Sequence, residues 1–396
     1  MVPHEPARSR RASVADGLQA FQRSPAQLRR RRQRFVVYPA PIGHMSSHHV
    51  YPVGGSLDEA DDDVQRLVRW FEAQPVGKER FRWALRDSLD ELMDGQRTGR
   101  WCYQHLTKTE KTHLGTVIEV NLTREFELED GDDLDWKVDG IDVDCKFSKT
   151  LGGWEIPMEM YRCEDHGGRS GKADHPALVV WLCDDHSVWG AGLVTITDDR
   201  LGWTSGGPGA PRRRRYNRDN KRTLSSAALQ EIRWLWGRPE HPLPSNTLRH
   251  LEEAKRARIF ADSNSGQKRI NQLFTEVQNE LIGRATVLTV AQQDDSVKRP
   301  RDARLQLRGK GIIVLGHQGT HPKVATLLGL DVPTKGEWIA TRLAPVALAD
   351  PRPKFRLAGQ WWAVADESEA ETPAPDVADI GRKNRSFEVP IGPDEL

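Results

Sequence analysis

Residues 134–148 read LDWKVDGIDVDCKFS, and this stretch decides the fold of the first half of the chain. Apolar and polar residues alternate strictly on both sides of the Asp139-Gly140 pair. The period of two predicts two strands, and an aspartate-glycine pair favours a tight turn between them. We therefore expect a β-hairpin with one buried face and one acidic face that is open to water.

Three polar residues of this hairpin can carry chemistry. Asp144 and Lys146 are two residues apart on one strand, so both side chains point to the same face. Asp135 lies on the partner strand, where the hairpin can bring it close to Asp144. Neighbouring carboxylates repel each other unless a cation lies between them, and Mg²⁺ accepts carboxylate, carbonyl and phosphate oxygens. The backbone carbonyl of Cys145 lies between the two side chains and is a further candidate ligand.

This arrangement suits metal-assisted hydrolysis of a phosphodiester, with Lys146 stabilising charge on a phosphoryl oxygen. Aspartate-rich strands also occur at the solvated edges of sheets, and the short pattern D-x-K arises often by chance. Glu119 lies in the helical stretch before the hairpin, among Val117, Ile118 and Val120. It either belongs to the exposed side of that helix or points at the site, and the residues alone leave both possibilities open.

Helices are predicted before the hairpin and strands after it. The tetrads Ser56–Glu59 and Thr107–Glu110 have the form of capping boxes, and each opens a stretch with apolar residues at helical spacing. A further amphipathic helix is expected over 78–93. Strands are expected over 154–161, 177–183 and 189–196, and the last two are apolar enough to be central in a sheet.

Composition excludes several classes of protein. The chain has 396 residues, of which 37% are hydrophobic and 29% charged, and no apolar run is long enough to cross a membrane. Its four cysteines form no CxxC pair, which disfavours both a disulfide scaffold and a structural zinc finger. A reducing compartment fits this cysteine usage.

The net charge of +1 hides a strong asymmetry along the chain. Residues 50–150 hold 14 basic and 23 acidic residues, whereas residues 207–357 hold 28 basic and 14 acidic residues. The acidic part is suited to hold a cation, and the basic part should attract a polyanion such as DNA.

Five segments follow from composition. We expect a disordered, Arg-rich extension over 1–49, although a transit peptide or a true start at Met45 would also explain it. A catalytic domain over 50–206 and a DNA-binding domain over 223–365 would be joined by a basic linker over 207–222. Residues 366–396 are acidic and rich in proline, which is typical of a disordered tail.

The basic domain offers several candidate DNA contacts. Helix-turn-helix units are possible over 324–342 and over 245–281, although plain helical packing would give the same patterns. A loop or wing near residue 300 could contact the phosphate backbone. The candidate DNA-binding residues are Lys298, Arg299, Arg301, Arg304, Lys323, Lys335 and Arg342.

The stretch GTVIEVNLTREFELEDGDDLDWKVDGIDVDCKFSKTLGGWEIPMEMY, residues 115–161, resembles the catalytic core of NaeI-type type II restriction endonucleases, within the PD-(D/E)xK nuclease superfamily. The resemblance extends over about 52–365. It implies an α/β fold, with a restriction-endonuclease-like mixed sheet flanked by helices and a C-terminal winged-helix domain similar to that of the catabolite activator protein. It also implies that Asp135, Asp144 and Lys146 are catalytic together with Glu119, and that Asp135, Asp144, the Cys145 carbonyl and Glu119 bind Mg²⁺. Leu134 replaces the proline of the superfamily name, which has no chemical role.

A second motif carries the same resemblance. Residues 92–97, LMDGQR, are similar to the K-x-D-G-x-R nucleotidyl-transfer motif of DNA ligases, an element that NaeI-type enzymes share. The motif residues are Leu92, Asp94, Gly95 and Arg97. Leucine at position 92 offers no amine for an adenylyl group, so ligase or topoisomerase activity is not expected. Without the resemblance, the same residues predict the end of a helix.

The resemblance implies a Mg²⁺-dependent type II restriction endonuclease that acts as a homodimer and breaks both strands at a palindromic, GC-rich site such as GCCGGC. A second DNA copy on the C-terminal domain would act as an allosteric activator. The enzyme would belong to a restriction-modification system of the bacterial cytoplasm. Its functional partner would be a cognate DNA methyltransferase, and no membrane partner is expected. Two alternatives remain: a DNA-binding regulator with an inactive nuclease-like domain, and a repair-type nickase.

Overall fold

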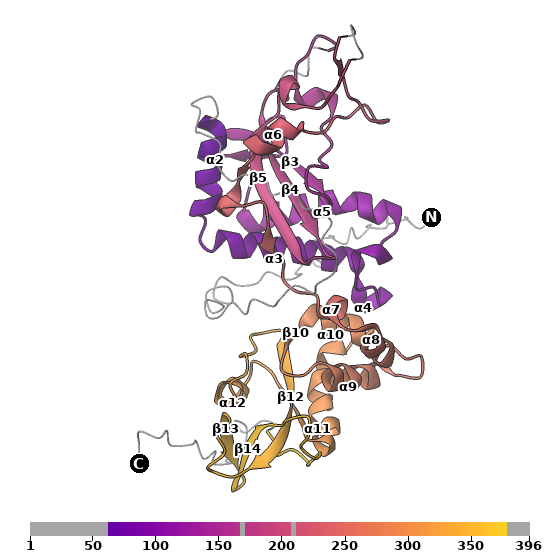
Figure 1. Cartoon of the computed structure of the whole chain (residues 1–396), viewed down its shortest axis with the longest axis vertical. Coiled ribbons are helices and arrows are strands. Elements are labelled where there is room, and N and C mark those ends of the chain that lie inside the picture. Colours follow the sequence, from indigo (N-terminus) through magenta and orange to yellow (C-terminus); the bar gives the residue numbers. More distant parts are fainter. Residues whose placement is uncertain (1–61, 167–170, 207–210, 378–396) are drawn as a thin grey trace, which may run out of the picture. The chain divides into compact units, whose positions relative to one another are not determined.

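The computed structural model describes residues 62–166, 171–206 and 211–377. The predictions for residues 1–49, for the capping box at Ser56 and for the end of the acidic tail lie outside these ranges. The first part of the described chain forms a seven-stranded sheet in the order β1-β2-β3-β4-β5-β8, with β9 also paired to β5. Helices cover this sheet (Figure 1). The observed fold is therefore a mixed α/β sheet flanked by helices, as predicted.

The bounds of these elements are as follows. The strands are β1 (Glu129–Asp130), β2 (Trp136–Val138), β3 (Ile141–Ser148), β4 (Pro176–Cys183), β5 (Val188–Thr195), β8 (Arg233–Trp234) and β9 (His241–Pro242). The helices are α2 (Asp62–Ala73), α3 (Gly77–Met93), α4 (Gly95–Thr98), α5 (Lys108–Phe126) and α6 (Ser226–Glu231), with short 3-10 turns η3 (Tyr103–His105), η4 (Met158–Met160), η5 (Asp198–Arg200) and η6 (Leu235–Gly237). The predicted strands over 177–183 and 189–196 are confirmed as β4 and β5.

Each face of the sheet has its own core. On one face, apolar residues of β3, β4 and β5 pack against α2, α3 and α5. Phe81 of α3 stacks on Trp189 of β5 with 5.2 Å between ring centroids, and both side chains are fully buried. On the other face, Ala177, Val179 and Val194 pack against Trp154, Ile156, Tyr161, Leu201, Leu224 and Ala228. The sheet is thus covered on both sides, which explains why β4 is apolar along its whole length.

Helix α5 begins as the sequence predicts. The Thr107 side chain accepts a hydrogen bond from the backbone N–H of Glu110, and the Glu110 carboxylate accepts one from the backbone N–H of Thr107. Such a cap stabilises a helix by about 1 kcal/mol. It fixes the start of the helix that carries Glu119.

The predicted hairpin is confirmed as β2 and β3. Its turn places Asp139 and Gly140 at φ values of 52° and 77°, the left-handed region that a two-residue hairpin turn requires. The prediction that its acidic face is open to water is wrong. Strand β3 also pairs in parallel with β4, and Asp142 and Asp144 are only 9% and 6% exposed.

The segment 154–161 does not form the predicted strand. It makes one isolated bridge, between Ile156 and Arg222, and then the turn η4. Its large side chains instead fill the second core, where Trp154 donates a hydrogen bond from its indole to the carbonyl of Val180.

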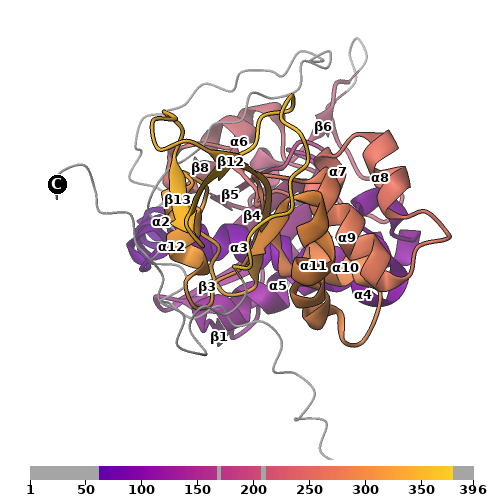
Figure 2. The same cartoon turned by 90° about the horizontal axis from the view of Figure 1, so that it is seen from below.

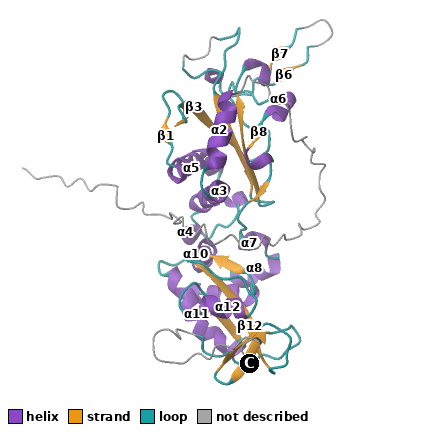
Figure 3. Cartoon of the chain, turned by 90° about the vertical axis from the view of Figure 1, so that its left-hand side faces the viewer, coloured by secondary structure: helices purple, strands orange, loops and turns teal. Residues whose placement is uncertain are grey.

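The structure differs from the expected linker over 207–222. Strand β7 (Arg213–Arg214) pairs with β6 (Trp203–Thr204), and Figure 3 shows this hairpin near α6 at one end of the sheet. Arg222 is buried, and β8 and β9, which follow it along the chain, pair with β5. The first sheet therefore continues to residue 242.

The remaining residues form a second sheet with its own helices. The strands are β10 (Leu281–Gly283), β11 (Ile312–Leu315), β12 (Glu337–Val346), β13 (Lys354–Leu357) and β14 (Gln360–Val364), in the order β10-β12-β14-β13 with β11 paired to β12. The helices are α7 (Thr247–His250), α8 (Glu253–Ile259), α9 (Gly266–Glu276), α10 (Arg284–Ala291), α11 (Arg299–Leu307) and α12 (His321–Leu327), with 3-10 turns η7 (Ser296–Lys298) and η8 (Arg308–Lys310). Helices α9, α10 and α11 lie together beside β12 (Figure 2).

Two predictions for this region are wrong. The helix-turn-helix unit over 324–342 is not formed, because its second half is the strand β12. The tail does not start at residue 366, since Ala374 and Val377 are buried in the second core and the Arg308 guanidinium donates to the carbonyl of Ala374. Within the described ranges, none of the helices combines the length and apolarity that crossing a membrane requires.

Candidate active site

The hairpin brings the predicted catalytic residues together. Trp136 of β2 pairs with Val143 of β3, so Asp135, one residue before β2, lies next to Asp144. One carboxylate oxygen of Asp135 accepts a hydrogen bond from the backbone N–H of Cys145 at 2.7 Å. This bond ties Asp135 to β3 between Asp144 and Lys146. We call Glu119, Asp135, Asp144 and Lys146 the acidic–lysine site.

Asp144 and Lys146 form an ion pair on the same side of β3. Burial raises the pKa of Asp144 to about 6, with a further increase from Asp135, while Lys146 opposes the shift. Burial alone would lower the pKa of Lys146, but Asp144 and then Asp135 raise it above its usual value. Lys146 is therefore a permanent cation next to carboxylates that favour a positive neighbour.

Glu119 of α5 joins this group electrostatically. Its pKa is raised by burial first and then by Asp135 and Asp144, whereas Lys146 lowers it. Glu119 is therefore within electrostatic range of Asp135, Asp144 and Lys146. Helix α5 lies against β3 at Gly115, where a Cβ would meet the Cβ of Phe147 at 3.5 Å, an ordinary van der Waals distance.

Asp142 is a residue of this site that the sequence did not single out. Its carboxylate accepts hydrogen bonds from the backbone N–H groups of Asp132 and Asp133 at 3.0 and 2.9 Å. These bonds lower its pKa, although burial acts in the opposite direction. Asp142 therefore holds the loop that leads into Asp135, and the D-x-D pattern of β3 is the only sequence feature that could have indicated it.

The donor set is compatible with a hard divalent cation bound by few protein ligands. No three acidic, cysteine or histidine side chains of the described residues are grouped closely enough to enclose a metal ion. Mg²⁺ does not need such a cage, because it is usually held by one or two carboxylates, a carbonyl, water and phosphate oxygens. Asp135, Asp144 and the Cys145 carbonyl are the donors on β3 and its neighbouring loop. Burial is the first cause that raises the pKa of Asp144 and of Glu119, and neighbouring carboxylates raise both further, so a bound cation would favour their charged forms.

The candidate DNA-binding residues of the basic domain come from several elements. Lys298 ends η7, Arg299 and Arg301 lie in the first turn of α11 and Arg304 in its last turn. Lys323 lies on α12, Lys335 precedes β12 and Arg342 lies on β12. Arg299 pairs with Asp295, Arg304 donates to the carbonyl of Val314, and Arg342 donates to the carbonyl of Glu369. The exposed cations of the set are Lys298, Arg301, Lys323 and Lys335.

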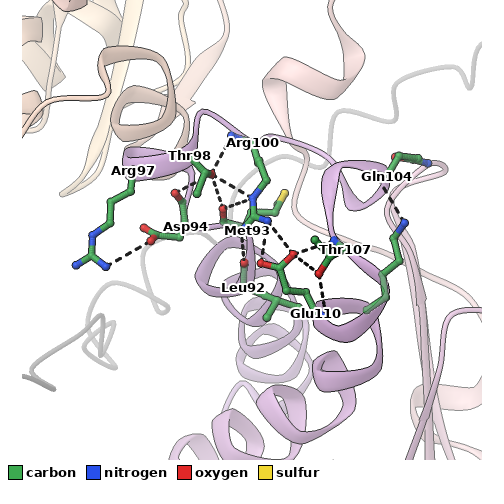
Figure 4. A network of polar contacts seen from close by, with 10 residues as sticks. Leu92, Met93, Asp94, Arg97, Thr98, Arg100, Gln104, Thr107 and Glu110 are labelled. Carbon is green, nitrogen blue, oxygen red and sulfur yellow. Dashed lines mark hydrogen bonds and ion pairs between the residues drawn. The ribbon is translucent and has the colours of Figure 1, made fainter.

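The ligase-like motif forms the end of α3. Asp94 adopts a left-handed conformation with φ of 44°, so α3 ends there and α4 begins at Gly95. Figure 4 shows Arg100 donating to the carbonyls of Leu92 and Met93 and pairing with Glu110. Arg97 makes only an exposed pair with Asp94 at 3.5 Å. The prediction of a helix end is confirmed, with Asp94 rather than glycine in the left-handed position.

Two comparisons identify the family. The family model described as "Restriction endonuclease NaeI" matches residues 65–373. The curated protein "Type II restriction enzyme NaeI" of Lentzea aerocolonigenes is 42% identical over 329 residues, which cover 81% of this chain and 95% of that protein. The match to the family model includes the whole acidic–lysine site and extends through the second sheet. The chain belongs to the NaeI family of restriction endonucleases.

Proposed function

We propose that the chain is a Mg²⁺-dependent deoxyribonuclease that cleaves both strands of DNA at a palindromic, GC-rich site such as GCCGGC. The observation that carries this proposal is the convergence of Asp135, Asp144 and Lys146 at the β2–β3 hairpin. Two carboxylates and one ammonium group beside a scissile phosphate are the groups that phosphodiester hydrolysis requires. Family membership adds cleavage at a specific DNA site.

In this proposal each residue has a separate role. Asp135, Asp144 and the Cys145 carbonyl hold Mg²⁺, with Glu119 as a more remote ligand. The bound ion supplies charge neutralisation at the phosphate and lowers the pKa of a water molecule. Lys146 places its ammonium group where negative charge develops on a phosphoryl oxygen. Asp142 is a positioning residue that acts through the loop before Asp135.

A plasmid assay tests this function. Supercoiled DNA incubated with the full chain should become linear with Mg²⁺ and should remain intact without it. Asp144→Ala should abolish cleavage while leaving DNA binding in place. Nicked circles alone would favour a repair-type nickase, and bound but intact DNA would favour a DNA-binding regulator with an inactive nuclease-like domain. Sequencing the ends of linear products identifies the site and tests its palindromic character.

For the C-terminal region we propose a winged-helix domain similar to that of the catabolite activator protein. The order α9, β10, α10, α11, β11, β12 supports this, since it matches the helix–strand–helix–helix–strand–strand order of winged-helix domains. Helix α11 would then read DNA, with exposed Arg301 and Lys298 at its start. Arg301→Gln should weaken DNA binding without changing the cleavage rate at saturating DNA.

Three further proposals concern partners. Two-fold symmetry of a palindrome favours a homodimer with one active site per strand. A second DNA copy on the C-terminal domain would act as an allosteric activator. A short duplex that carries the site, added to the plasmid assay, should therefore increase the rate of plasmid cleavage. A cognate DNA methyltransferase and a place in the bacterial cytoplasm follow from the restriction-modification role, with no membrane partner.

A further inference from the structure

A strongly basic segment lies outside the acidic–lysine site, between the strands β5 and β8 of the first sheet. We call residues 211–222 the basic arm. It holds seven cationic residues and one acidic residue, Asp219. Strand β7 pairs with β6 in a small sheet of its own, and the backbone of Arg222 exchanges two hydrogen bonds with Ile156, at 2.7 and 2.9 Å. Both ends of the described arm are therefore held by backbone pairing, one to β6 and the other to Ile156, which lies in the core on one face of the first sheet.

An arginine–tryptophan cluster holds the arm in place. The ring of Trp203 has three guanidinium groups near it, at 5.5 Å for Arg212, 4.9 Å for Arg214 and 5.2 Å for Arg222. Arg214 and Arg222 also pair with Asp198 at 2.7 and 2.5 Å. Their charges are thus compensated inside the protein, and these residues stabilise the arm rather than bind a ligand.

Arg213, Arg215 and Arg218, which lie between Arg212 and Arg222 in the sequence, are exposed to solvent. Because side chains alternate along a strand, Arg213 lies on the face of β7 opposite to Arg214. Arg215 follows the strand, and its guanidinium donates a hydrogen bond to the Thr223 hydroxyl at 3.5 Å. Arg213 and Arg215 are exposed, and the side chain of Arg218 is 88% exposed with only Asp219 as an ion-pair partner. A rigid backbone that presents arginines to solvent is suited to bind phosphates. Because the segment is already ordered in the free protein, binding causes little further loss of conformational entropy.

The register of the sheet places the arm on the catalytic face. Asp144 pairs with Ala177, and Ala177 pairs with Val194, so the three side chains share one face of the sheet. Ala177 and Val194 belong to the same core cluster as Ile156 and Tyr161. The guanidinium carbon of Arg222 lies 5.1 Å from the centroid of the Tyr161 ring, and the Arg222 backbone is hydrogen-bonded to that of Ile156. The end of the arm at Arg222 is therefore on that face.

The arm also starts at the same end of the sheet. Val194 is the last residue but one of β5, and the chain runs from there through Asp198 to Trp203 and the arm. Asp144 and the end of the basic arm at Arg222 are therefore on one face of the first sheet, and the chain leaves β5 towards the arm at the end of the sheet where Asp144 pairs with Ala177. A duplex whose phosphate lies at Asp144 would extend along this face.

We infer that the basic arm binds the DNA backbone beside the scissile phosphate, with Arg213, Arg215 and Arg218 as the phosphate contacts. This inference rests on the proposed nuclease function, because it identifies the ligand of the arm as the DNA that is cut. It assigns the arm to substrate binding rather than to a connection between domains.

The test compares two double variants of the full chain, without Mg²⁺. One is Arg213→Gln with Arg215→Gln. The matched control is Arg97→Gln with Lys108→Gln, which removes the same charge from exposed positions on α4 and α5. Binding of a 30-base-pair duplex carrying the cleaved sequence is measured by fluorescence anisotropy between 50 and 200 mM NaCl. Each phosphate contact contributes about −0.9 to the slope of log K against log salt, so the arm variant should lose about two units of slope.

The control variant should keep the wild-type slope, and Arg213→Lys with Arg215→Lys should restore it, because lysine also neutralises a phosphate. With Mg²⁺, the arm variant should show a raised KM and an unchanged kcat. An unchanged slope in the arm variant, or an equal loss in the control, would overturn the inference. Binding is measured without catalysis, so a wild-type chain that binds DNA but never cleaves it would contradict the nuclease function alone.

Discussion

The hydrogen bonds of Asp142 give the sharpest prediction about how the site is held together. In Asp142→Ala the backbone N–H groups of Asp132 and Asp133 lose a shared charged acceptor at 3.0 and 2.9 Å. Hydrogen bonds to charged groups contribute about 1.5–3 kcal/mol each, and water reaches these exposed residues, so the lower end applies. Two such bonds amount to about 3 kcal/mol, which is roughly a hundredfold in the population of the ordered loop.

Because Mg²⁺ selects the ordered loop, this loss should raise the Mg²⁺ concentration that gives half-maximal cleavage by up to about a hundredfold. The maximal rate should stay within about tenfold of the wild type, since Asp142 does not touch the substrate. Asp142→Asn keeps one acceptor oxygen and should lie between the two. Asp130→Ala, an exposed change on β1, is the matched control. A wild-type Mg²⁺ requirement in Asp142→Ala would refute the positioning role.

Three further outcomes follow from named contacts. Lys146→Ala should lower kcat by about a hundredfold or more, whereas Leu92→Ala should stay within about tenfold, as steady-state cleavage kinetics would show; comparable losses would undo the two role assignments. Burial lowers the pKa of His241 to about 4, below the ordinary value of 6.5, so the unfolded chain binds a proton first as the pH falls. The stability that His241 contributes is present above pH 6.5 and is lost as the pH falls towards 4, and by linkage about 2 kcal/mol of it should disappear between pH 7 and 5. Urea unfolding of wild type and His241→Gln at both values would measure that difference. Asp184→Asn should destabilise the fold by about 3–5 kcal/mol in the same assay, because the buried Arg86 loses the negative charge of its partner at 2.8 Å; a change below 1 kcal/mol would contradict this account.

Local patterns predicted the parts of the site that depend on neighbouring residues. The alternation on both sides of Asp139-Gly140 gave the β2–β3 hairpin, and the hairpin alone places Asp135 next to Asp144. The capping box at Thr107 gave the start of α5. These features are determined within about twenty residues of sequence, so they needed no knowledge of the rest of the fold.

Features that depend on distant pairing could not be predicted in this way. Asp144 is buried where β4, more than thirty residues later, pairs in parallel with β3. Val287, Thr289 and Val290 favour strands, yet they lie in the helix α10, where they are buried and their packing outweighs that preference.

The charge count was informative but was assigned to the wrong part of the chain. Seven of the 28 basic residues counted over 207–357 belong to the basic arm, which lies in the chain before β8 and β9 of the first sheet. Glycine and proline near residue 208 suggested a linker, whereas Trp203, Asp198 and Tyr161 supply partners that fix the arginines. Composition cannot show such partners, because they are brought together only by the folded sheet.

The account depends most directly on one divalent ion shared by Asp135 and Asp144. Binding of Mn²⁺, used in place of Mg²⁺, can be followed by electron paramagnetic resonance on the full chain with plasmid DNA present. We predict that Asp135→Ala and Asp144→Ala each weaken Mn²⁺ binding at least tenfold, while Asp130→Ala binds as the wild type does. If both site variants kept the wild-type Mn²⁺ affinity, the two aspartates would not hold a common ion and the catalytic assignment would be contradicted.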